Sequence, residues 1–369
     1  MKEIEQVAAA LDRQDYRGAA KLLKQLQKQS PQNPWVKLYI GRWYEATDKL
    51  ESAEKVYRKL LQTASHPKII SQAREGVKRL EAIEQERRQD AIARTKADPR
   101  SGEPAVLILE PVEPERKPEV AKILARLLKT DTYSARMQLQ SRGWRLYRTG
   151  ELGELGVYGR EMLDADIPVF WVSLADIDSL HVFRVSHIQS LSPQPAVVCR
   201  DETDRLGALS FDWSEVARRV EGLLPLFVET MDYDPRRRKS DRFRHREITQ
   251  DYANIHDLHL PGRRSILRFC DQTYEFQKGV QFNPEADATS PNSPTQQTAR
   301  LQWNRLVETF DLNLKTAPLW SEFTPFAETT LDYTQLLSRI APHLDLDRKT
   351  ETPWDPAFQL YSGLVYLKE

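Results

Sequence analysis

A set of small and apolar residues near the N-terminus recurs after 34 positions, and this period constrains the fold more than any other feature of the sequence. The matched positions are Ala19, Leu23, Leu26 and Pro31 in the first copy and Ala53, Tyr57, Leu60 and Ser65 in the second. A period of this length fits one antiparallel helix pair per copy. Because one pair cannot bury its apolar face alone, the copies are expected to stack, and residues 1–95 are predicted to form a helical domain.

Local signals place the helices within this period. Two amphipathic helices are predicted over 6–11 and 16–29, with Asp15 as the N-cap of the second. Pro34 stands in the first turn of a third helix, which ends before Thr47–Asp48. A fourth helix carries Ala53 and Tyr57. A further helix over 68–93 is expected to cap the array, with Ile70, Val77, Leu80 and Ile83 as its apolar stripe.

The second copy resembles the tetratricopeptide repeat family. Gly41 and Tyr44 occupy the small and aromatic positions of the first helix, and Ala53 and Tyr57 occupy those of the second. The chain departs from the family pattern at its tryptophan and proline positions, which are Lys37 and Ser65, and the first copy is degenerate. The resemblance implies stacked helix pairs whose concave side holds a segment of another protein.

Charge and composition indicate the compartment and the kind of partner. The whole chain is neutral, with 54 basic and 54 acidic residues, but residues 1–104 carry a net charge of +6. Such a module fits an acidic partner, or the acidic remainder of the same chain. No apolar run reaches membrane-span length and the N-terminus lacks a signal-peptide core, so a cytoplasmic location is expected. Cys199 and Cys270 are expected to be reduced thiols.

After a polar linker at 95–104 the pattern changes to that of an α+β domain over 105–282, with 105–178 and 179–282 as possible subdomains. In the first part, strands are predicted at 106–109, 144–147 and 169–174, with helices at 118–128, at 133–140 and before 163. In the second part, strands are predicted at 182–185, 197–199, 206–211, 266–269 and 274–276. The segment 213–224 is interpreted as a helix or loop, and Leu260–Arg263 as a hairpin turn. The sheet is expected to be mixed or antiparallel, either a small barrel or a twisted half-open sheet.

The last part of the chain combines a polar segment with an aromatic-rich tail. Residues 283–298 have the composition of a linker. Helices are predicted around 301–310 and 326–340, in a helical C-terminal segment over 299–369. Nine aromatic side chains are expected to pack onto the body: Trp303, Phe310, Trp320, Phe323, Phe326, Tyr333, Trp354, Phe358 and Tyr361.

Two motifs were weighed as sites for catalysis or cofactors. Gly150, Gly153, Gly156 and Gly159 lack the spacing and the lysine of phosphate-binding loops, so they are interpreted as a turn and a small helix face, and no cofactor is expected. His256 and His259 form a pair with metal-ligand chemistry. On a strand their odd offset would point them to opposite faces, so a structural role or a surface position is favoured and no metal is assigned.

A basic cluster over 236–246 is the densest charge in the chain and could bind an anion. Its cations are Arg236, Arg237, Arg238, Lys239, Arg242, Arg244 and Arg246. Neighbouring carboxylates partly neutralise it, and a solvated surface loop is the preferred interpretation over protein or nucleic-acid contact.

These patterns favour a non-enzymatic adaptor or assembly factor that binds a protein partner through its N-terminal helices. The polar residues expected to face the partner are Arg13, Arg17, Lys37 and Arg42, which suits an acidic segment. One alternative is a nucleic-acid-associated protein using the basic cluster. Another is a metal-dependent hydrolase using His256 and His259.

Overall fold

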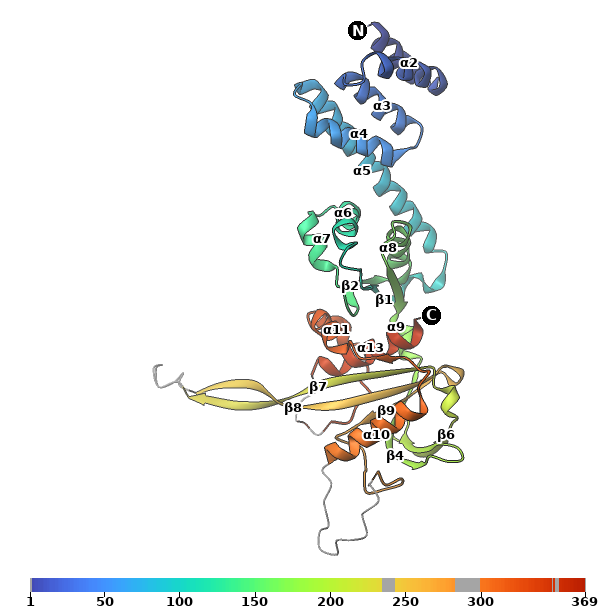
Figure 1. Cartoon of the computed structure of the whole chain (residues 1–369), viewed down its shortest axis with the longest axis vertical. Helices are drawn as coiled ribbons and strands as arrows, with labels where there is room; N and C mark the ends of the chain where they lie inside the picture. Colours follow the sequence, from blue (N-terminus) through green and yellow to red (C-terminus); the bar gives the residue numbers. More distant parts are fainter. Residues whose placement is uncertain (1, 234–242, 283–298, 347, 349–351, 369) are drawn as a thin grey trace, which may run out of the picture. The chain divides into compact units, whose positions relative to one another are not determined.

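The computed structural model describes residues 2–368 except for 234–242, 283–298, 347 and 349–351. The chain divides into two compact units, residues 1–97 and 98–369. The first unit is built from five helices among the residues described: α1 (Lys2–Asp12), α2 (Tyr16–Gln29), α3 (Pro34–Ala46), α4 (Leu50–Thr63) and α5 (Pro67–Thr95) (Figure 1). The predicted all-helical N-terminal domain is confirmed.

The helix ends follow the local signals in the sequence. The Asp15 carboxylate accepts a hydrogen bond from the Gly18 backbone N–H at 2.8 Å, which caps α2. Pro34 is in the first turn of α3, and the Asn33 side chain caps it by accepting from the Trp35 N–H at 3.0 Å. Each cap satisfies a backbone donor that has no partner inside its helix.

The buried stripe of the capping helix α5 agrees with the prediction only at Leu80. Its buried residues are Ile69, Ala73, Gly76 and Leu80. Ile70, Val77 and Ile83 are only partly buried. The small residues Ala73 and Gly76 face the neighbouring helices because they permit close approach, a property that a search for large apolar residues overlooks.

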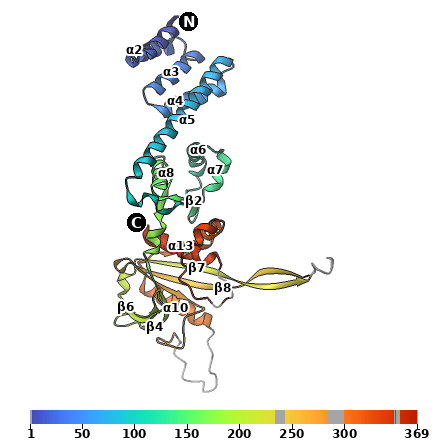
Figure 2. The ribbon, with the colours of Figure 1, turned by 180° about the vertical axis from the view of Figure 1, so that it is seen from behind.

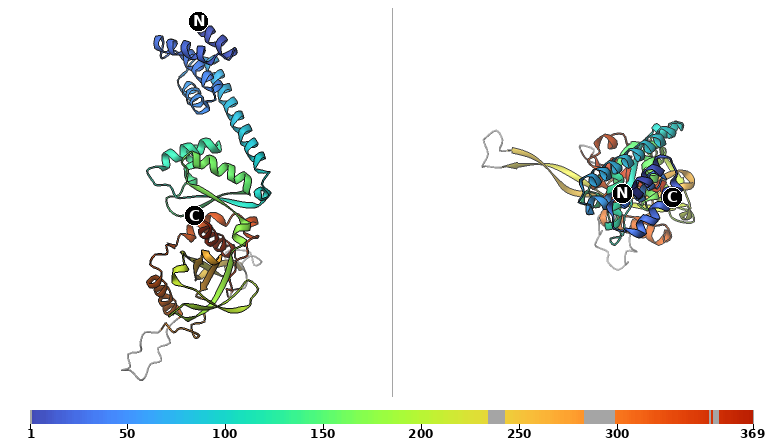
Figure 3. Two further views of the ribbon diagram at one scale, coloured as in Figure 1. Left: turned by 90° about the vertical axis from the view of Figure 1, so that its right-hand side faces the viewer. Right: turned by 90° about the horizontal axis from the view of Figure 1, so that it is seen from above.

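The second unit starts with the turn η1 (Pro99–Gly102) and a three-stranded antiparallel sheet of order β2-β1-β3. Its elements are β1 (Pro104–Leu109), α6 (Lys117–Leu128), α7 (Thr132–Gln138), β2 (Arg145–Glu151), α8 (Leu152–Asp164) and β3 (Val169–Ser173). Leu107 of β1 packs with residues of α6 and α8, which cover one face of this sheet (Figure 3). Val106 and Ile108 face the opposite way, into a core shared with the C-terminal helices.

The rest of the unit forms a mixed seven-stranded sheet of order β10-β7-β8-β9-β4-β5-β6. Its strands are β4 (His181–Ser190), β5 (Ala196–Arg200), β6 (Leu206–Ser210), β7 (Arg218–Tyr233), β8 (Phe243–Leu260), β9 (Ser265–Cys270) and β10 (Leu319–Trp320). Short helical segments connect them: α9 (Leu174–Asp178), η2 (Trp213–Glu215) and η4 (Pro261–Arg263). The predicted α+β class with a mixed sheet is confirmed, as is the turn at 260–263, which joins the antiparallel strands β8 and β9.

Three sequence predictions in this region were wrong. The segment 213–224 is a short turn followed by the start of β7, not a helix or a simple loop. Residues 274–276 lie outside any strand; the rings of Tyr274 and Phe276 pack together with centroids 4.6 Å apart. The expected helix over 326–340 is broken into α11 (Phe323–Thr330) and α12 (Thr334–Leu337).

Helices cover both faces of the seven-stranded sheet. α11 and α13 (Trp354–Leu367) lie on one side of β7 and β8, and α10 (Ala299–Asn313) lies on the other (Figure 1). Away from the other strands, β7 and β8 continue as a two-stranded ribbon paired as far as Tyr233 and Phe243 (Figure 2). Most of the C-terminal aromatic side chains are buried, including Phe310, Phe323 and Phe358, which lie in the apolar clusters on the two faces of the sheet.

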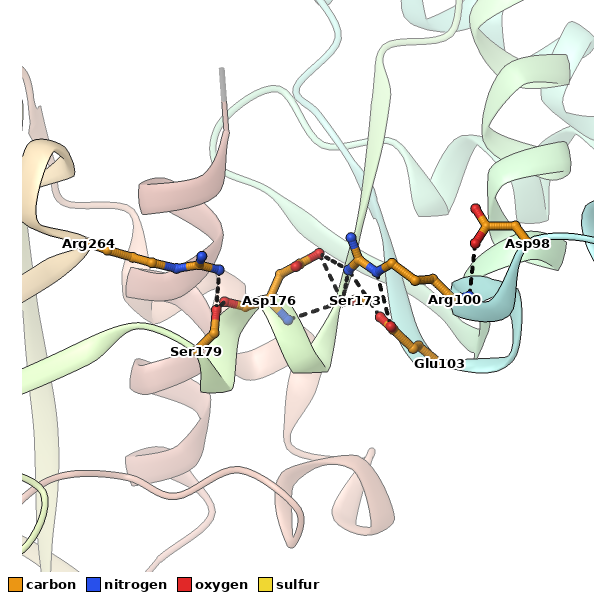
Figure 4. A network of polar contacts seen from close by, with 7 residues as sticks. All are labelled: Asp98, Arg100, Glu103, Ser173, Asp176, Ser179 and Arg264. Atoms are coloured by element: carbon orange, nitrogen blue, oxygen red, sulfur yellow. Dashed lines mark hydrogen bonds and ion pairs between the residues drawn. The ribbon is translucent and has the colours of Figure 1, made fainter.

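A polar network joins the start of the second unit to both sheets (Figure 4). The Arg100 guanidinium donates to Glu103 at 3.0 Å and to Asp176 at 2.7 Å. Ser179 donates to the Asp176 carbonyl and accepts from Arg264, each at 2.5 Å. The network links η1, α9 and the residue after η4, which are far apart in the sequence.

We predict that Gly76→Val destabilises the N-terminal unit. A Cβ on Gly76 would stand 2.6 Å from the ring of Tyr57, which is fully buried and cannot move into solvent. Overpacking of this kind costs about 1–3 kcal/mol. The measurement is denaturant unfolding followed by far-UV circular dichroism. Gly102→Val is the control because a Cβ at Gly102 meets no atom within 4 Å; equal stability of the two variants would contradict the packing.

Candidate partner-binding site

Helix α3 is the centre of the N-terminal unit because it packs against helices on two sides. Val36 is buried with Val7 of α1 and Leu23 of α2. On another side of α3, Leu38 is buried in a cluster that contains residues of α4 and α5. Packing on two sides therefore fixes the orientation of α3 relative to its neighbouring helices. It also fixes where the residues between the two packed sides lie on the surface of this unit.

Tyr57 fixes the junction of α3, α4 and α5. Its ring lies between Gly41 and Gly76. A Cβ atom added to either glycine would stand 2.6 Å from a ring carbon. Its hydroxyl donates to the Glu45 carboxylate at 2.7 Å, and the Arg79 guanidinium donates to the same carboxylate at 2.7 and 3.0 Å. Burial raises the pKa of the Glu45 carboxyl, but the hydrogen bonds from Arg79 and Tyr57 outweigh it and lower the pKa overall.

Trp35, Tyr39 and Arg42 form one line along α3, because residues four and seven positions apart fall on the same side of a helix. Each is partly exposed. The Arg42 guanidinium lies over the Tyr39 ring, 5.3 Å from its centroid, and the Trp35 ring meets His66 edge to face at 5.7 Å. This line, the Trp35–Arg42 line, offers aromatic surface and a cation on a rigid helix.

The structure separates the residues that the sequence placed on one binding face. Lys37 and Arg42 are five residues apart on α3 and so point about 140° apart around its axis. The Lys37 ammonium donates to the Gln32 side chain at 2.7 Å. Arg13 follows the end of α1 and Arg17 is in the first turn of α2, and both are exposed.

Sequence analysis did not select Trp35 and Tyr39 as binding residues. Their spacing of seven and three residues from Arg42 was the signal for a shared face of α3.

The basic cluster cannot be placed as a site. Residues 236–242, which include Arg236, Arg237, Arg238, Lys239 and Arg242, lie outside the described part of the chain. The backbone of residues 243–246, with Arg244 and Arg246, belongs to the start of β8.

His256 and His259 lie on opposite faces of β8, as their odd offset predicted. His256 packs against Phe310 of α10 at a ring distance of 5.1 Å. On the other face, the Nε2 atom of His259 is 3.0 Å from the Ser362 hydroxyl of α13. Both imidazoles are buried and do not converge, and the residues described contain no group of three or more potential metal ligands. The geometry does not support a hydrolase built on this pair.

Ser362 belongs to a buried polar network rather than to an open active site. Its hydroxyl donates to the Asp257 carboxylate at 2.6 Å. The Arg268 guanidinium donates to the same carboxylate through two nitrogens, at 2.9 and 2.7 Å. The Arg268 and Asp257 side chains are 1% and 0% exposed, so no substrate reaches them in this conformation.

The glycine series and the cysteines have packing roles. Gly153, Gly156 and Gly159 form a small face of α8, and a Cβ on Gly159 would stand 2.2 Å from the Trp171 ring of β3. The predicted small helix face is thus confirmed, but the predicted turn is wrong, because Gly150 lies in β2 and α8 follows that strand directly. Cys199 and Cys270 are free and buried, and burial raises the pKa of each thiol to about 11.

Comparison with known proteins identifies the N-terminal region. Residues 10–69 match the family model described as tetratricopeptide repeat, which confirms the resemblance for this part of the chain. This range runs from the end of α1 into the start of α5 and includes the Trp35–Arg42 line. No curated protein and no solved structure matches the chain. Across the residues described, no helix is long and apolar enough to cross a membrane.

We predict that the buried histidines make the second unit less stable in acid. Burial, followed by the charge of Arg219, lowers the pKa of His256 to about 4 from 6.5. Because the unfolded state binds the proton first, stability should fall as the pH drops from 6.5 toward 4, by up to about 1.4 kcal/mol per pH unit for one histidine.

His256→Gln should reduce this slope in denaturant titrations at several pH values. His181→Gln is the control, because the His181 side chain is 62% exposed. A slope unchanged in His256→Gln would refute the assignment.

Proposed function

We propose that this protein is an adaptor or assembly factor that holds a segment of another protein on its N-terminal repeat. The observation that carries the proposal is the tetratricopeptide repeat match over residues 10–69, since such repeats stack helix pairs to form a binding groove. The first helices of successive pairs line the concave side of that groove, and α3 is such a helix, in contact with both α1 and α5.

The Trp35–Arg42 line supplies the chemistry of this groove. Aromatic side chains and arginine are the residues most enriched where binding energy concentrates. Among the described residues, no carboxylate forms an ion pair with Arg42, so its N–H donors are available to a ligand. A guanidinium pairs with a carboxylate through two parallel hydrogen bonds, which favours an acidic segment as the ligand.

The net charge of the N-terminal region supports the same choice of ligand. Residues 1–104 carry a net charge of +6, and Arg13 and Arg17 are exposed near the turn between α1 and α2. A positive field accelerates the encounter with an acidic chain even without direct contacts. Lys37 and Arg42 point in different directions, so their separate substitution distinguishes a local contact from this general field.

We predict that Arg42→Glu abolishes capture of the native partner by tagged full-length protein, because it places a repulsive carboxylate against an acidic segment. Lys59→Glu on α4 makes the same change of charge at an exposed position on the second helix of the pair. The measurement is quantitative mass spectrometry of co-purified proteins, with melting temperatures to show that all variants fold. Equal loss with Lys37→Glu, Arg42→Glu and Lys59→Glu would indicate only a general field, and undiminished binding with Arg42→Glu would exclude this face.

A second candidate function is nucleic-acid binding through the basic cluster, and the ribbon of β7 and β8 favours it. A two-stranded β-ribbon fits the major groove of duplex DNA, and the basic segment connects the ends of these two strands. This candidate predicts that the protein binds a random-sequence duplex. The logarithm of the binding constant should fall linearly with the logarithm of the salt concentration. Replacing Arg236–Lys239 with alanine should remove that binding in a filter or anisotropy assay. Binding that is absent at low salt would exclude the candidate.

A further inference from the structure

A cavity of about 310 Å³ lies on the α10 side of β7 and β8, in the second unit. Three parts of the chain form it: the two strands, α10, and the stretch from the end of β10 into the first turn of α11. Its lining includes Glu221, Asn254, His256, Trp303 and Thr324. Glu221 and His256 are directly opposite each other in the antiparallel pair, so their side chains share one face of the sheet.

Within the part of the chain that the structure describes, the Glu221 carboxylate lacks a hydrogen-bonding partner. No hydrogen bond or ion pair to it is formed by any residue the structure describes. Burial raises the pKa of Glu221 and the negative charge of Asp311 raises it further, whereas the positive charge of Arg219 lowers it; the net direction is upward. A half-buried carboxylate without a partner is unfavourable, and a bound cation would compensate it.

Arg219, whose positive charge acts on Glu221, forms its ion pair with Asp311. The Arg219 guanidinium is 2.5 Å from the Asp311 carboxylate, and its side chain is 8% exposed. The Arg219 and Asp311 charges therefore offset each other. His256 is neutral at pH 7 because burial lowers its pKa to about 4. Among the described residues that line the cavity, Glu221 is thus the one charged group.

The remaining polar groups of the cavity can accept hydrogen bonds. The Asn254 side-chain amide donates to Asp271 at 2.5 Å, which leaves its Oδ1 atom as an acceptor. His256 is 1% exposed, and its Nε2 atom has no hydrogen-bond partner among the described residues. A buried polar atom in this state is normally satisfied by a ligand or an ordered water. Trp303 and Val307 of α10 supply an apolar wall beside these groups.

We propose that this cavity binds a small organic amine, with the ammonium group at Glu221 and Asn254 and an apolar or aromatic body against Trp303. An ammonium group supplies three donors and one positive charge, which matches an unpaired carboxylate with neighbouring acceptors. The neutral imidazole of His256 does not repel the cation. This site lies outside the helical repeat and is independent of partner binding there.

The test uses benzylamine as the probe and the full-length protein, with saturation-transfer NMR to detect binding and calorimetry to measure affinity. Benzylamine should bind in the micromolar to millimolar range. Benzyl alcohol and benzoate have the same ring without the positive charge, and they should bind at least about tenfold more weakly, because a matched charge contributes more than 1.4 kcal/mol.

Two variants locate the site. Glu221→Gln keeps the shape of the side chain and removes its charge, and it should weaken benzylamine binding by about tenfold or more without lowering the melting temperature. Glu308→Gln removes an equal charge from an exposed position on α10 and should leave the affinity unchanged. Equal binding of benzylamine and benzyl alcohol, equal affinity of Glu221→Gln and the unmodified protein, or no binding at millimolar benzylamine would each overturn the proposal.

Discussion

The second unit depends on one buried ion pair, between Arg268 of β9 and Asp257 of β8. Both side chains are removed from water, so each charge is tolerated only because the other is present. The pair extends to the C-terminal helix, because Ser362 of α13 donates to Asp257, and to the segment before α13, because Arg268 donates to the Pro342 carbonyl at 2.7 Å. Two strands and a helix from distant parts of the sequence are thereby held in one register.

The alternation of side chains along β8 lets one strand have two different environments. Ala253, Ile255, Asp257 and His259 lie on the face that α13 covers, whereas Asn254, His256 and Leu258 lie on the face that α10 covers. On the α13 face, Arg268, Asp257, Ser362 and the Nε2 atom of His259 form one hydrogen-bonded network. On the α10 face, at the cavity, the Nε2 atom of His256 and the Glu221 carboxylate have no hydrogen-bond partner among the described residues. β8 thus carries a structural network on one face and, on the other face, Asn254 and His256 of the cavity lining.

Sequence analysis located elements with strong local patterns and missed those whose pattern is weak. Strand β1 was found because five consecutive residues, 105–109, are apolar and buried on both faces. The ribbon of β7 and β8 was missed because it carries many charges and little regular alternation. The partner-binding prediction selected Arg42 by its charge but grouped it with Lys37, because a set of polar residues does not reveal which sides of α3 are covered by neighbouring helices.

The sequence by itself determined the helical repeat, because caps, small residues and aromatic residues act within one helix pair and recur with a fixed period. It also determined that His256 and His259 must diverge on a strand, since alternation is a local property of the backbone. Only the tertiary structure decided what surrounds them. Glu221, His256 and Trp303 come together from three elements, and whether a carboxylate is paired or left without a partner depends on long-range packing that no local pattern encodes.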